Sequence, residues 1–369
     1  MTPQPKHIVI DARIRRSSTG RYTDRLVEHL QDIDTHNRYT ILVQSDDPWR
    51  MHNPNFTTVV APYAQFSFNP VDQLRFTRQL RQLKPDVVHF TMTQQPLPYF
   101  GNIVTTTHDL TMLRFVRRGS TPLPVYWLKM GLYKFMVRWS HDKSKKIIVP
   151  THFVAKDVAA FQPSAADKLV VTYEASEPPL DVASLKPGAI SSPFIMYVGT
   201  AFPHKNLEKL VAAFDILHAA RPDLKLVLVG KKERHYEALE AEIAKHPSKD
   251  NIILTGFVPD ESLKWLYSHC EAYVFTSLSE GFGLPPLEAM QHGAPVVSSN
   301  ASCMPEVSGE AAHYFDPTNP ADIARGVADV LDNPNLRLNL IEKGYRQVKK
   351  YSWRRMAEQT LAVYHDLLK

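Results

Sequence analysis

The sequence contains few cysteines and no long apolar segment. Cys270 and Cys303 are the only cysteines among 369 residues, and no Cys/His spacing is typical of a zinc site. No apolar run is long enough to cross a bilayer, and the first residues show no charged-then-apolar export pattern. We therefore expect reduced, buried cysteines, no metal, and a cytoplasmic protein that is at most peripheral at the inner face of a membrane.

Motifs for metal and nucleic-acid binding are also missing. The Asp-x-Asp sequence at 32–34 lies at the end of a predicted helix, where a solvated turn is the ordinary interpretation. The acidic run at 45–47 follows a predicted strand, but a loop is again favoured. Because no nucleic-acid-binding motif occurs, we expect no nucleic-acid partner. We also expect no cofactor.

Positive charge is unevenly distributed along the chain. The formal net charge is +5, but residues 1–180 carry +8 and residues 181–369 carry −3. Most of the excess lies in 114–146, which holds nine basic residues and one acidic residue. Because 369 residues exceed what one hydrophobic core usually holds, we expect two domains with different surfaces.

Short apolar segments alternate with amphipathic ones in both halves of the chain. This alternation predicts two α/β domains, each a doubly wound parallel sheet. The proline-rich stretch 174–193 lacks periodicity and is the best linker candidate. Strands are predicted at 6–14, 38–44, 85–91, 102–110, 145–151, 168–173, 194–200, 225–230, 251–256, 272–277 and 295–299, and helices at 19–33, 70–83, 205–220, 233–245, 260–268, 286–292 and 353–368.

The stretch SLSEGFGLPPLEAMQHGAP, at 277–295, places two glutamates around a predicted helix start. Unpaired N–H groups near Gly281, Gly283 and Leu284 would attract an anion such as a phosphate. Glu280 and Glu288 would flank that anion and accept hydrogen bonds from hydroxyl groups, as a molecule of sugar, phosphate and sugar requires. From spacing alone, a capping glutamate and a solvated helix glutamate remain an equal alternative.

Other polar residues follow predicted strands. Lys205 lies at a helix start, where it opposes the helix dipole, so a bound anion would explain it better than a solvated side chain. His108 and Asp109 end a strand of the first half, and a histidine there can donate to a sugar hydroxyl or be satisfied by local backbone. Gly20 would allow a close backbone approach, and the loop with Phe257 and Val258 could meet a base.

At this point the chain resembles the family 4 retaining glycosyltransferases, which have the GT-B fold. The segments STGRYT, TTTHDL, VGTAFPHKNL, TGFVP and SEGFGLPPLEAMQHGAPVVSS occur in the family's order over nearly the whole length. The resemblance implies two Rossmann-like domains facing across a cleft. Residues 1–180 would bind the acceptor and 190–350 the nucleotide-sugar, with 353–369 packing back on the first domain.

The resemblance also implies residue roles. Glu280 would bind the transferred sugar, Glu288 the ribose and Lys205 the diphosphate. The backbone of Gly281, Phe282, Gly283 and Leu284 would hold the sugar and diphosphate, Gly20 would approach the phosphates, and His108 would lie near the reacting carbon.

One position departs from the family pattern. Thr200 stands where the family often has an arginine, so charge neutralisation would depend more on Lys205 and on His204. Some family members resemble this sequence at that position.

The expected reaction is transfer of a hexose with retention, from a nucleoside diphosphate sugar to a saccharide or lipid-linked saccharide. The motifs lean toward GDP-mannose, with UDP-glucose and UDP-N-acetylglucosamine open. The acceptor hydroxyl would attack from the face that the diphosphate leaves, without a metal. Asp109 is the one candidate for a covalent double displacement. A nucleotide-sugar epimerase and a non-catalytic nucleotide-sugar-binding protein, for which Thr200 is the only hint, are the alternatives.

The basic, aromatic stretch 113–146 has two interpretations. A helix after Pro124 would carry Leu128, Leu132, Phe135 and Trp139 on one stripe, with Lys134 and Arg138 off it. It could lie on an anionic membrane, which would suit a lipid-linked acceptor. It could equally be a core helix with a basic exposed face.

Overall fold

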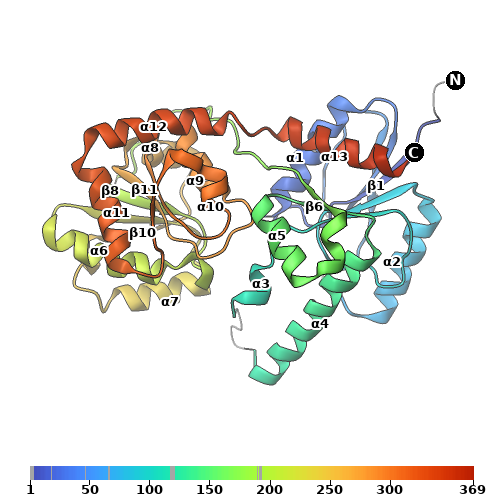
Figure 1. Ribbon diagram of the computed structural model, residues 1–369, viewed down its shortest axis with the longest axis horizontal. Coiled ribbons are helices and arrows are strands. Elements are labelled where there is room, and N and C mark those ends of the chain that lie inside the picture. The colour runs from blue at the N-terminus through green and yellow to red at the C-terminus, as the bar shows by residue number, and fades with distance from the viewer. Residues whose placement is uncertain are drawn as a thin grey trace. The chain divides into compact units, whose positions relative to one another are not determined.

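The computed structural model describes residues 4–17, 19–45, 47–64, 67–116, 121–188, 190 and 193–369 (Figure 1). The chain forms two compact units. The N-terminal unit comprises Met1–Leu113, Arg118–Glu174 and Ser352–Lys369, and the C-terminal unit comprises Arg114–Arg117 and Ala175–Tyr351. Parts of three predicted segments lie outside the described residues: Asp46 of the acidic run, 117–120 of the basic stretch, and 189 and 191–192 of the linker.

The N-terminal unit contains a seven-stranded parallel sheet with the order β3-β2-β1-β4-β5-β6-β7. One inner strand, HIVID, is buried along its whole length, as expected of a strand covered on both faces. The strands are β1 (His7–Asp11), β2 (Arg38–Val43), β3 (Phe56–Val60), β4 (Val87–Phe90), β5 (Ile103–Thr106), β6 (Lys146–Val149) and β7 (Leu169–Val171).

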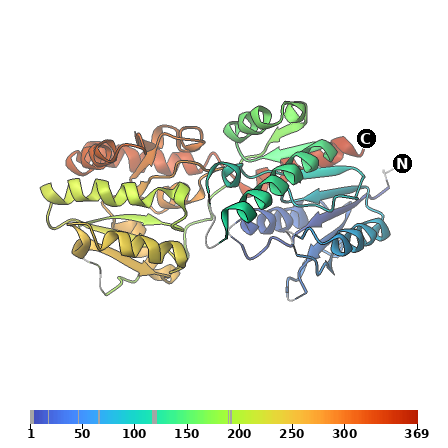
Figure 2. The ribbon, with the colours of Figure 1, turned by 90° about the horizontal axis from the view of Figure 1, so that it is seen from below.

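Helices flank this sheet, and the last of them comes from the far end of the chain (Figures 1 and 2). The helix α13 (Trp353–Leu367) packs against α1 (Gly20–Ile33). Tyr364 of α13 bonds through its hydroxyl to His89 Nδ1 of β4 at 2.6 Å, and His89 Nε2 lies 2.8 Å from Thr106 Oγ1. The remaining helices up to β7 are α2 (Pro70–Leu83), α3 (Thr111–Arg114), α4 (Leu123–Lys143), α5 (His152–Phe161) and the 3-10 turn η1 (Pro163–Lys168).

The C-terminal unit contains a six-stranded parallel sheet with the order β10-β9-β8-β11-β12-β13. The strands are β8 (Phe194–Val198), β9 (Lys225–Val229), β10 (Ile252–Gly256), β11 (Ala272–Phe275), β12 (Val296–Ser299) and β13 (Ala312–Phe315). The helices are α6 (Leu207–Ala220), α7 (Arg234–Ile243), α8 (Asp260–His269), α9 (Leu284–Gln291), α10 (Met304–Ser308), α11 (Pro320–Asp332) and α12 (Pro334–Val348), with 3-10 turns η2 (Pro203–Lys205), η3 (Lys249–Asn251) and η4 (Gly309–Ala311).

Two parallel α/β sheets confirm the predicted fold class, and the bounds of α2 agree with the predicted range. Asn69 begins α2 because its side-chain oxygen accepts from the Val71 N–H at 3.0 Å. Several elements were missed: β3, α5, β13, α11 and α12. The strand β3 exposes most of its residues at a sheet edge, so its sequence does not show the apolar pattern of a buried strand.

The described helices include none with the length and apolarity needed to cross a membrane. Both cysteines are free and buried, as expected. His89 is fully buried, and burial lowers its pKa to about 3, so the ring is neutral and depends on neutral partners.

The bond between Tyr364 and His89 should stabilise the N-terminal unit. We expect Tyr364→Phe to lower its free energy of unfolding by about 1–3 kcal/mol, because a buried ring nitrogen loses its partner. Urea unfolding followed by circular dichroism measures the change. Tyr345→Phe, at a residue 45% exposed on α12, is the matched control and should have little effect. Equal stabilities of the two variants would contradict the assignment.

Candidate functional site

The sheet of the C-terminal unit has a topological switch point between β8 and β11. These strands are neighbours, yet the chain runs from β8 to β9 on one side and from β11 to β12 on the other. In open parallel sheets, a ligand crevice forms where neighbouring connections diverge in this way, at the carboxyl ends of the strands. Lys205 follows β8 and Glu280 follows β11, so both predicted residues lie at this point.

Lys205 and Glu280 form an ion pair there. Lys205 Nζ lies 2.5 Å from Glu280 Oε1, and the side chains are only 14% and 13% exposed. The two loops are also joined by hydrogen bonds to backbone carbonyls. Thr276 Oγ1 donates to the Lys205 carbonyl at 2.8 Å. The Leu278 N–H donates to the His204 carbonyl at 2.7 Å. The structure therefore brings together the predicted diphosphate-binding lysine and the predicted sugar-binding glutamate.

The loop that carries Glu280 is held tightly from behind. The Glu280 N–H donates to Ser302 Oγ at 3.2 Å, and Cys303 Sγ donates to the Glu280 carbonyl. Gly283 has φ +89°, and a Cβ there would lie 2.7 Å from Met304 Sδ. The Met304 side chain can move, so the positive φ is the constraint that favours glycine at this position.

Glu288 lies on α9, one turn after the helix begins at Leu284, and is partly exposed. Both glutamates act on one buried tyrosine. Burial is the main cause that raises the pKa of Tyr273 well above its usual range, and the charges of Glu288 and Glu280 contribute. Glu280 lies on the loop and Glu288 on the helix that follow β11. Their roles toward the sugar and the ribose stay predictions.

The other residues predicted to bind a nucleotide-sugar lie on the same edge. Phe257 directly follows β10 and is 73% exposed, although it is apolar, whereas Val258 is half-buried. Thr200 is exposed, and its carbonyl accepts from the Tyr197 hydroxyl at 3.0 Å. Four of the predicted residues on this edge, His204, Gly281, Phe282 and Gly283, are buried, with the Phe282 ring against Tyr351.

Sequence reasoning missed a group of cations on this edge. Lys231, Lys232 and Arg234 follow β9, the neighbour of β8, and all three are exposed. A Cβ on Gly230 would lie 2.1 Å from the Gly199 carbonyl, so the loops after β8 and β9 are in contact. The sequence GKKER, directly after the predicted strand 225–230, is the signal that points to these cations.

His108 of the N-terminal unit is hydrogen-bonded within that unit. Its Nδ1 lies 3.2 Å from Glu174 Oε1, its Nε2 lies 3.1 Å from the Thr91 carbonyl, and its ring meets Tyr22 edge-on. Asp109 accepts from the Thr111 N–H at 2.7 Å and so begins α3. These contacts give both residues local structural roles, and contact of His108 with a donor sugar stays a prediction.

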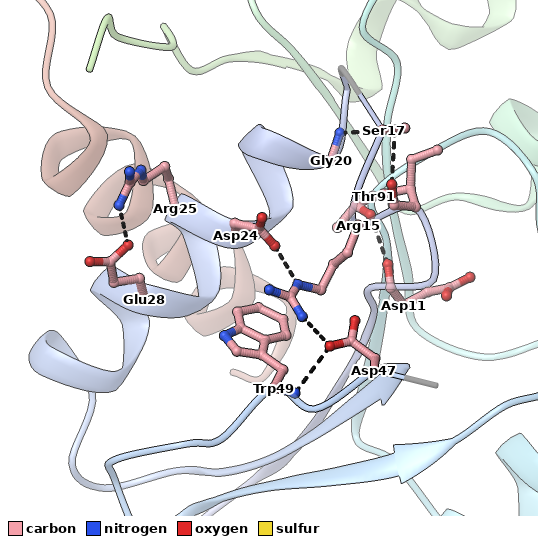
Figure 3. A network of polar contacts seen from close by, with 11 residues as sticks. Asp11, Arg15, Ser17, Gly20, Asp24, Arg25, Glu28, Asp47, Trp49 and Thr91 are labelled. Atoms are coloured by element: carbon pink, nitrogen blue, oxygen red, sulfur yellow. Dashed lines mark hydrogen bonds and ion pairs between the residues drawn. The ribbon is translucent and has the colours of Figure 1, made fainter. Parts of the chain in front are cut away.

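Gly20 also has a local explanation. A Cβ at Gly20 would lie 2.7 Å from the Ile14 carbonyl, because the loop after β1 folds back onto the start of α1. Arg15 fixes this loop (Figure 3): its guanidinium bonds to Asp24 and Asp47, each at 2.5 Å, and lies 3.6 Å from the Trp49 ring centroid. Close packing of the loop requires the glycine, whether or not a phosphate approaches it.

Metal binding has no candidate site in the described parts of the chain. No group of three or more His, Cys, Asp or Glu side chains there could hold an ion.

The pair of Lys205 and Glu280 should contribute to the stability of the C-terminal unit. In a double-mutant cycle with Lys205→Met and Glu280→Gln, we expect a coupling energy of about 1–3 kcal/mol, because each single variant leaves a poorly solvated partner. Urea unfolding of the four proteins gives the value. The exposed pair of Lys343 and Glu310 is the control, with an expected coupling below about 1 kcal/mol. Equal coupling energies for both pairs would show that the pair of Lys205 and Glu280 stabilises the unit no more than an exposed pair does.

Comparison with known proteins agrees with this geometry. A family model described as Glycosyltransferase Family 4 matches residues 19–175, and one described as Glycosyl transferases group 1 matches 187–347. O-antigen chain mannosyltransferase B from Escherichia coli is 29% identical over 71% of this chain and 69% of its own length. The serotype-specific mannosyltransferase WbdA from Escherichia coli is 30% identical over 62% of this chain, which spans only 28% of that longer protein.

Solved structures share the fold at low sequence identity. Sucrose-phosphate synthase from Thermosynechococcus elongatus has a TM-score of 0.74 at 17% identity, with 98% of this chain and 99% of that chain covered. Anabaena Alr3699/HepE in complex with UDP-glucose has a TM-score of 0.71 at 14% identity, with 98% and 100% covered. The chain belongs to glycosyltransferase family 4, with the GT-B fold, and is a retaining hexosyltransferase.

Proposed function

We propose that the chain transfers mannose from GDP-mannose to a saccharide acceptor carried on a lipid. The observation that supports the donor site is the pair of Lys205 and Glu280 at the switch point, with Glu288 on the adjoining helix. The relatives are named as an O-antigen chain mannosyltransferase and a serotype-specific mannosyltransferase. These names support mannose as the sugar and a polysaccharide as the acceptor. UDP-glucose and UDP-N-acetylglucosamine are the alternative donors.

Donor binding would rearrange the ion pair. Lys205 turns from the Glu280 carboxylate to the diphosphate, which carries more negative charge, and Glu280 becomes free to accept hydrogen bonds from the sugar hydroxyls. Glu288 accepts from the ribose hydroxyls, and exposed Phe257 is positioned to stack on the base. The cations after β9 supply positive charge next to Thr200, where the family's arginine is missing.

The chemical step breaks the bond between the anomeric carbon and the leaving phosphate oxygen. Lys205 and the backbone amides near Gly283 stabilise the charge that develops on the diphosphate, and removal of one such donor typically costs about 3–4 kcal/mol. The acceptor oxygen then bonds to the anomeric carbon on the same face, and its proton passes to the leaving phosphate oxygen. Asp109 is not needed as a nucleophile, and its bond to the Thr111 N–H assigns it to the start of α3.

The donor assignment predicts the effect of two substitutions. Lys205→Ala should reduce nucleotide release from the donor by about 100-fold or more, and Glu280→Gln by about tenfold or more, because both lose transition-state contacts. Coupled detection of released nucleoside diphosphate measures the rates. Glu310→Gln is the matched control, since that carboxylate is 87% exposed.

Two results would contradict this proposal. Wild-type rates in both variants would remove the catalytic assignment, and interconversion of the donor sugar without nucleotide release would indicate an epimerase. A panel of nucleoside diphosphates in a thermal-shift assay identifies the base, because the bound one raises Tm by linkage. Loss of that shift in Glu288→Gln locates the ribose.

The helix α4 supports a lipid-bound acceptor. The sequence left open whether the apolar stripe of α4 packs in the core. The core interpretation is wrong for Leu128, Leu132 and Phe135, which are exposed. Leu128 is 66% exposed and Phe135 51%, while Met136 and Val137 pack inward instead. Exposed apolar residues on α4 are Leu123, Val125, Trp127, Leu128, Leu132 and Phe135.

Charge on α4 has one sign over most of its length. Lys129, Lys134 and Arg138 are exposed, and Asp142 near the end is the helix's one acidic residue. An exposed face with aromatic and aliphatic side chains next to cations suits the headgroup region of an anionic bilayer. We therefore propose that α4 rests on an anionic membrane surface and brings the enzyme to its acceptor.

Vesicle flotation tests this surface. With vesicles containing phosphatidylglycerol, replacement of Lys129, Lys134 and Arg138 by glutamine should weaken binding by about 100-fold, since each cation near such a surface contributes about 1 kcal/mol. Replacement of three exposed cations of the C-terminal unit, Arg346, Lys349 and Lys350, is the control and should leave binding unchanged. Equal binding of the α4 variant and the wild type would reject the proposal.

A further inference from the structure

The sheet of the N-terminal unit has its own switch point, and a small polar pocket lies there. From β1 the chain runs to β2 on one side, and from β4 to β5 on the other. The pocket lies beyond the carboxyl ends of these strands, where a ligand crevice is expected. Its lining includes Arg13, Tyr63, Phe76, Gln94, Gln95 and Met136.

The loop after β4 that carries the two glutamines is held by three side chains, one from α2 and two from α4. The Leu97 N–H donates to Gln73 Oε1 at 2.7 Å, and Trp139 Nε1 donates to the Leu97 carbonyl at 3.2 Å. Lys143 Nζ donates to the carbonyls of Pro96 and Leu97, at 3.1 and 2.9 Å. The backbone of this loop is therefore held in one place.

Within this fixed loop, the glutamine amides are buried without partners. Gln94 is 4% exposed and Gln95 is 3% exposed. Among the described residues, neither Gln94 Nε2 nor Gln95 Nε2 and Oε1 has a hydrogen-bond partner. A buried amide without partners destabilises the fold, so such groups in a rigid loop call for a ligand that satisfies them.

The charges around the pocket favour an uncharged ligand. Asp11 neutralises Arg13 through two bonds, from Nε at 2.8 Å and from Nη2 at 2.7 Å, and Arg13 Nη1 donates to the Tyr63 carbonyl at 2.9 Å. The guanidinium also stacks 4.2 Å from the Phe76 ring centroid. Asp72, in the same lining, adds a negative charge that would repel an anion.

We propose that this pocket holds a hydroxyl arm of the acceptor saccharide. A hydroxyl group both donates and accepts, which matches the NH₂ and carbonyl ends of a glutamine amide. The enclosed space is about 10 Å³, which suits one such group, with the sugar ring at the mouth. Apolar Met136 and Pro96 line the same pocket and suit the C–H face of a sugar ring. This inference rests on the proposed saccharide acceptor.

Saturation-transfer NMR with neutral sugars tests the pocket. The probes are the methyl α-glycosides of mannose, glucose, galactose and N-acetylglucosamine, each presented to the whole protein. We expect at least one to bind the wild type, and its signal to fall at least fivefold in Gln94→Met and in Gln95→Met. Gln82→Met, at an exposed glutamine of α2, should leave the signal unchanged.

Thermal unfolding separates a binding role from a structural one. Methionine fills the space of glutamine without unsatisfied polar atoms, so Tm should stay the same or rise in both pocket variants. A fall in Tm in both would show that the amides stabilise the fold, and would overturn the proposal. So would wild-type glycoside signals in the variants, or no signal from any probe.

Two further measurements keep the inference separate from the proposed function. The glycoside signals are recorded without donor, so they do not depend on the rate of nucleotide release. Absence of nucleotide release in the wild type would reject the proposed function whatever the glycoside result. Inorganic phosphate that binds the wild type and not Gln95→Met would overturn the choice of an uncharged ligand.

Discussion

The ion pair of Lys205 and Glu280 joins the loop after β8 to the loop after β11. The connections that follow these two neighbouring strands run to opposite sides of the sheet. Everything assigned to the donor site is placed relative to this pair: Glu288 one turn into α9, Phe257 and Thr200 along the same strand edge, and the cations after β9 beside them. The two opposite charges of the pair neutralise each other. In the proposed function, the diphosphate carries more negative charge than Glu280 and competes with it for Lys205.

The carboxyl edges of the two sheets serve different chemistry. In the C-terminal unit the edge is rich in cations and in backbone amides, which suits phosphate groups. In the N-terminal unit the corresponding switch point has Arg13 already neutralised by Asp11, and offers amides instead. We therefore propose an anion site at the switch point of one unit and a hydroxyl site at that of the other.

Much of the fold could be predicted from the sequence, because buried parallel strands such as HIVID and FIMYV are continuous apolar runs. The missed helices α11 and α12 have the N-cap residues Asn319 and Asn333, each followed by proline, a capping signal that periodicity alone does not use. The paired glutamates could be predicted from one motif. Gln94 and Gln95 could not, since two adjacent glutamines look like any loop until their burial is known.

The helix α13 has a consequence for the order of folding. It is translated after the whole stretch 175–351, yet it completes the N-terminal unit through α1 and the bond of Tyr364 to His89. Domains usually fold as they emerge during synthesis, the first one first. Here the first unit lacks the contacts of α13 with α1 and His89 until the end of the chain is made, while the second unit, nearly continuous in sequence, can already close. The later half of the chain is thus the part that can finish folding on the ribosome.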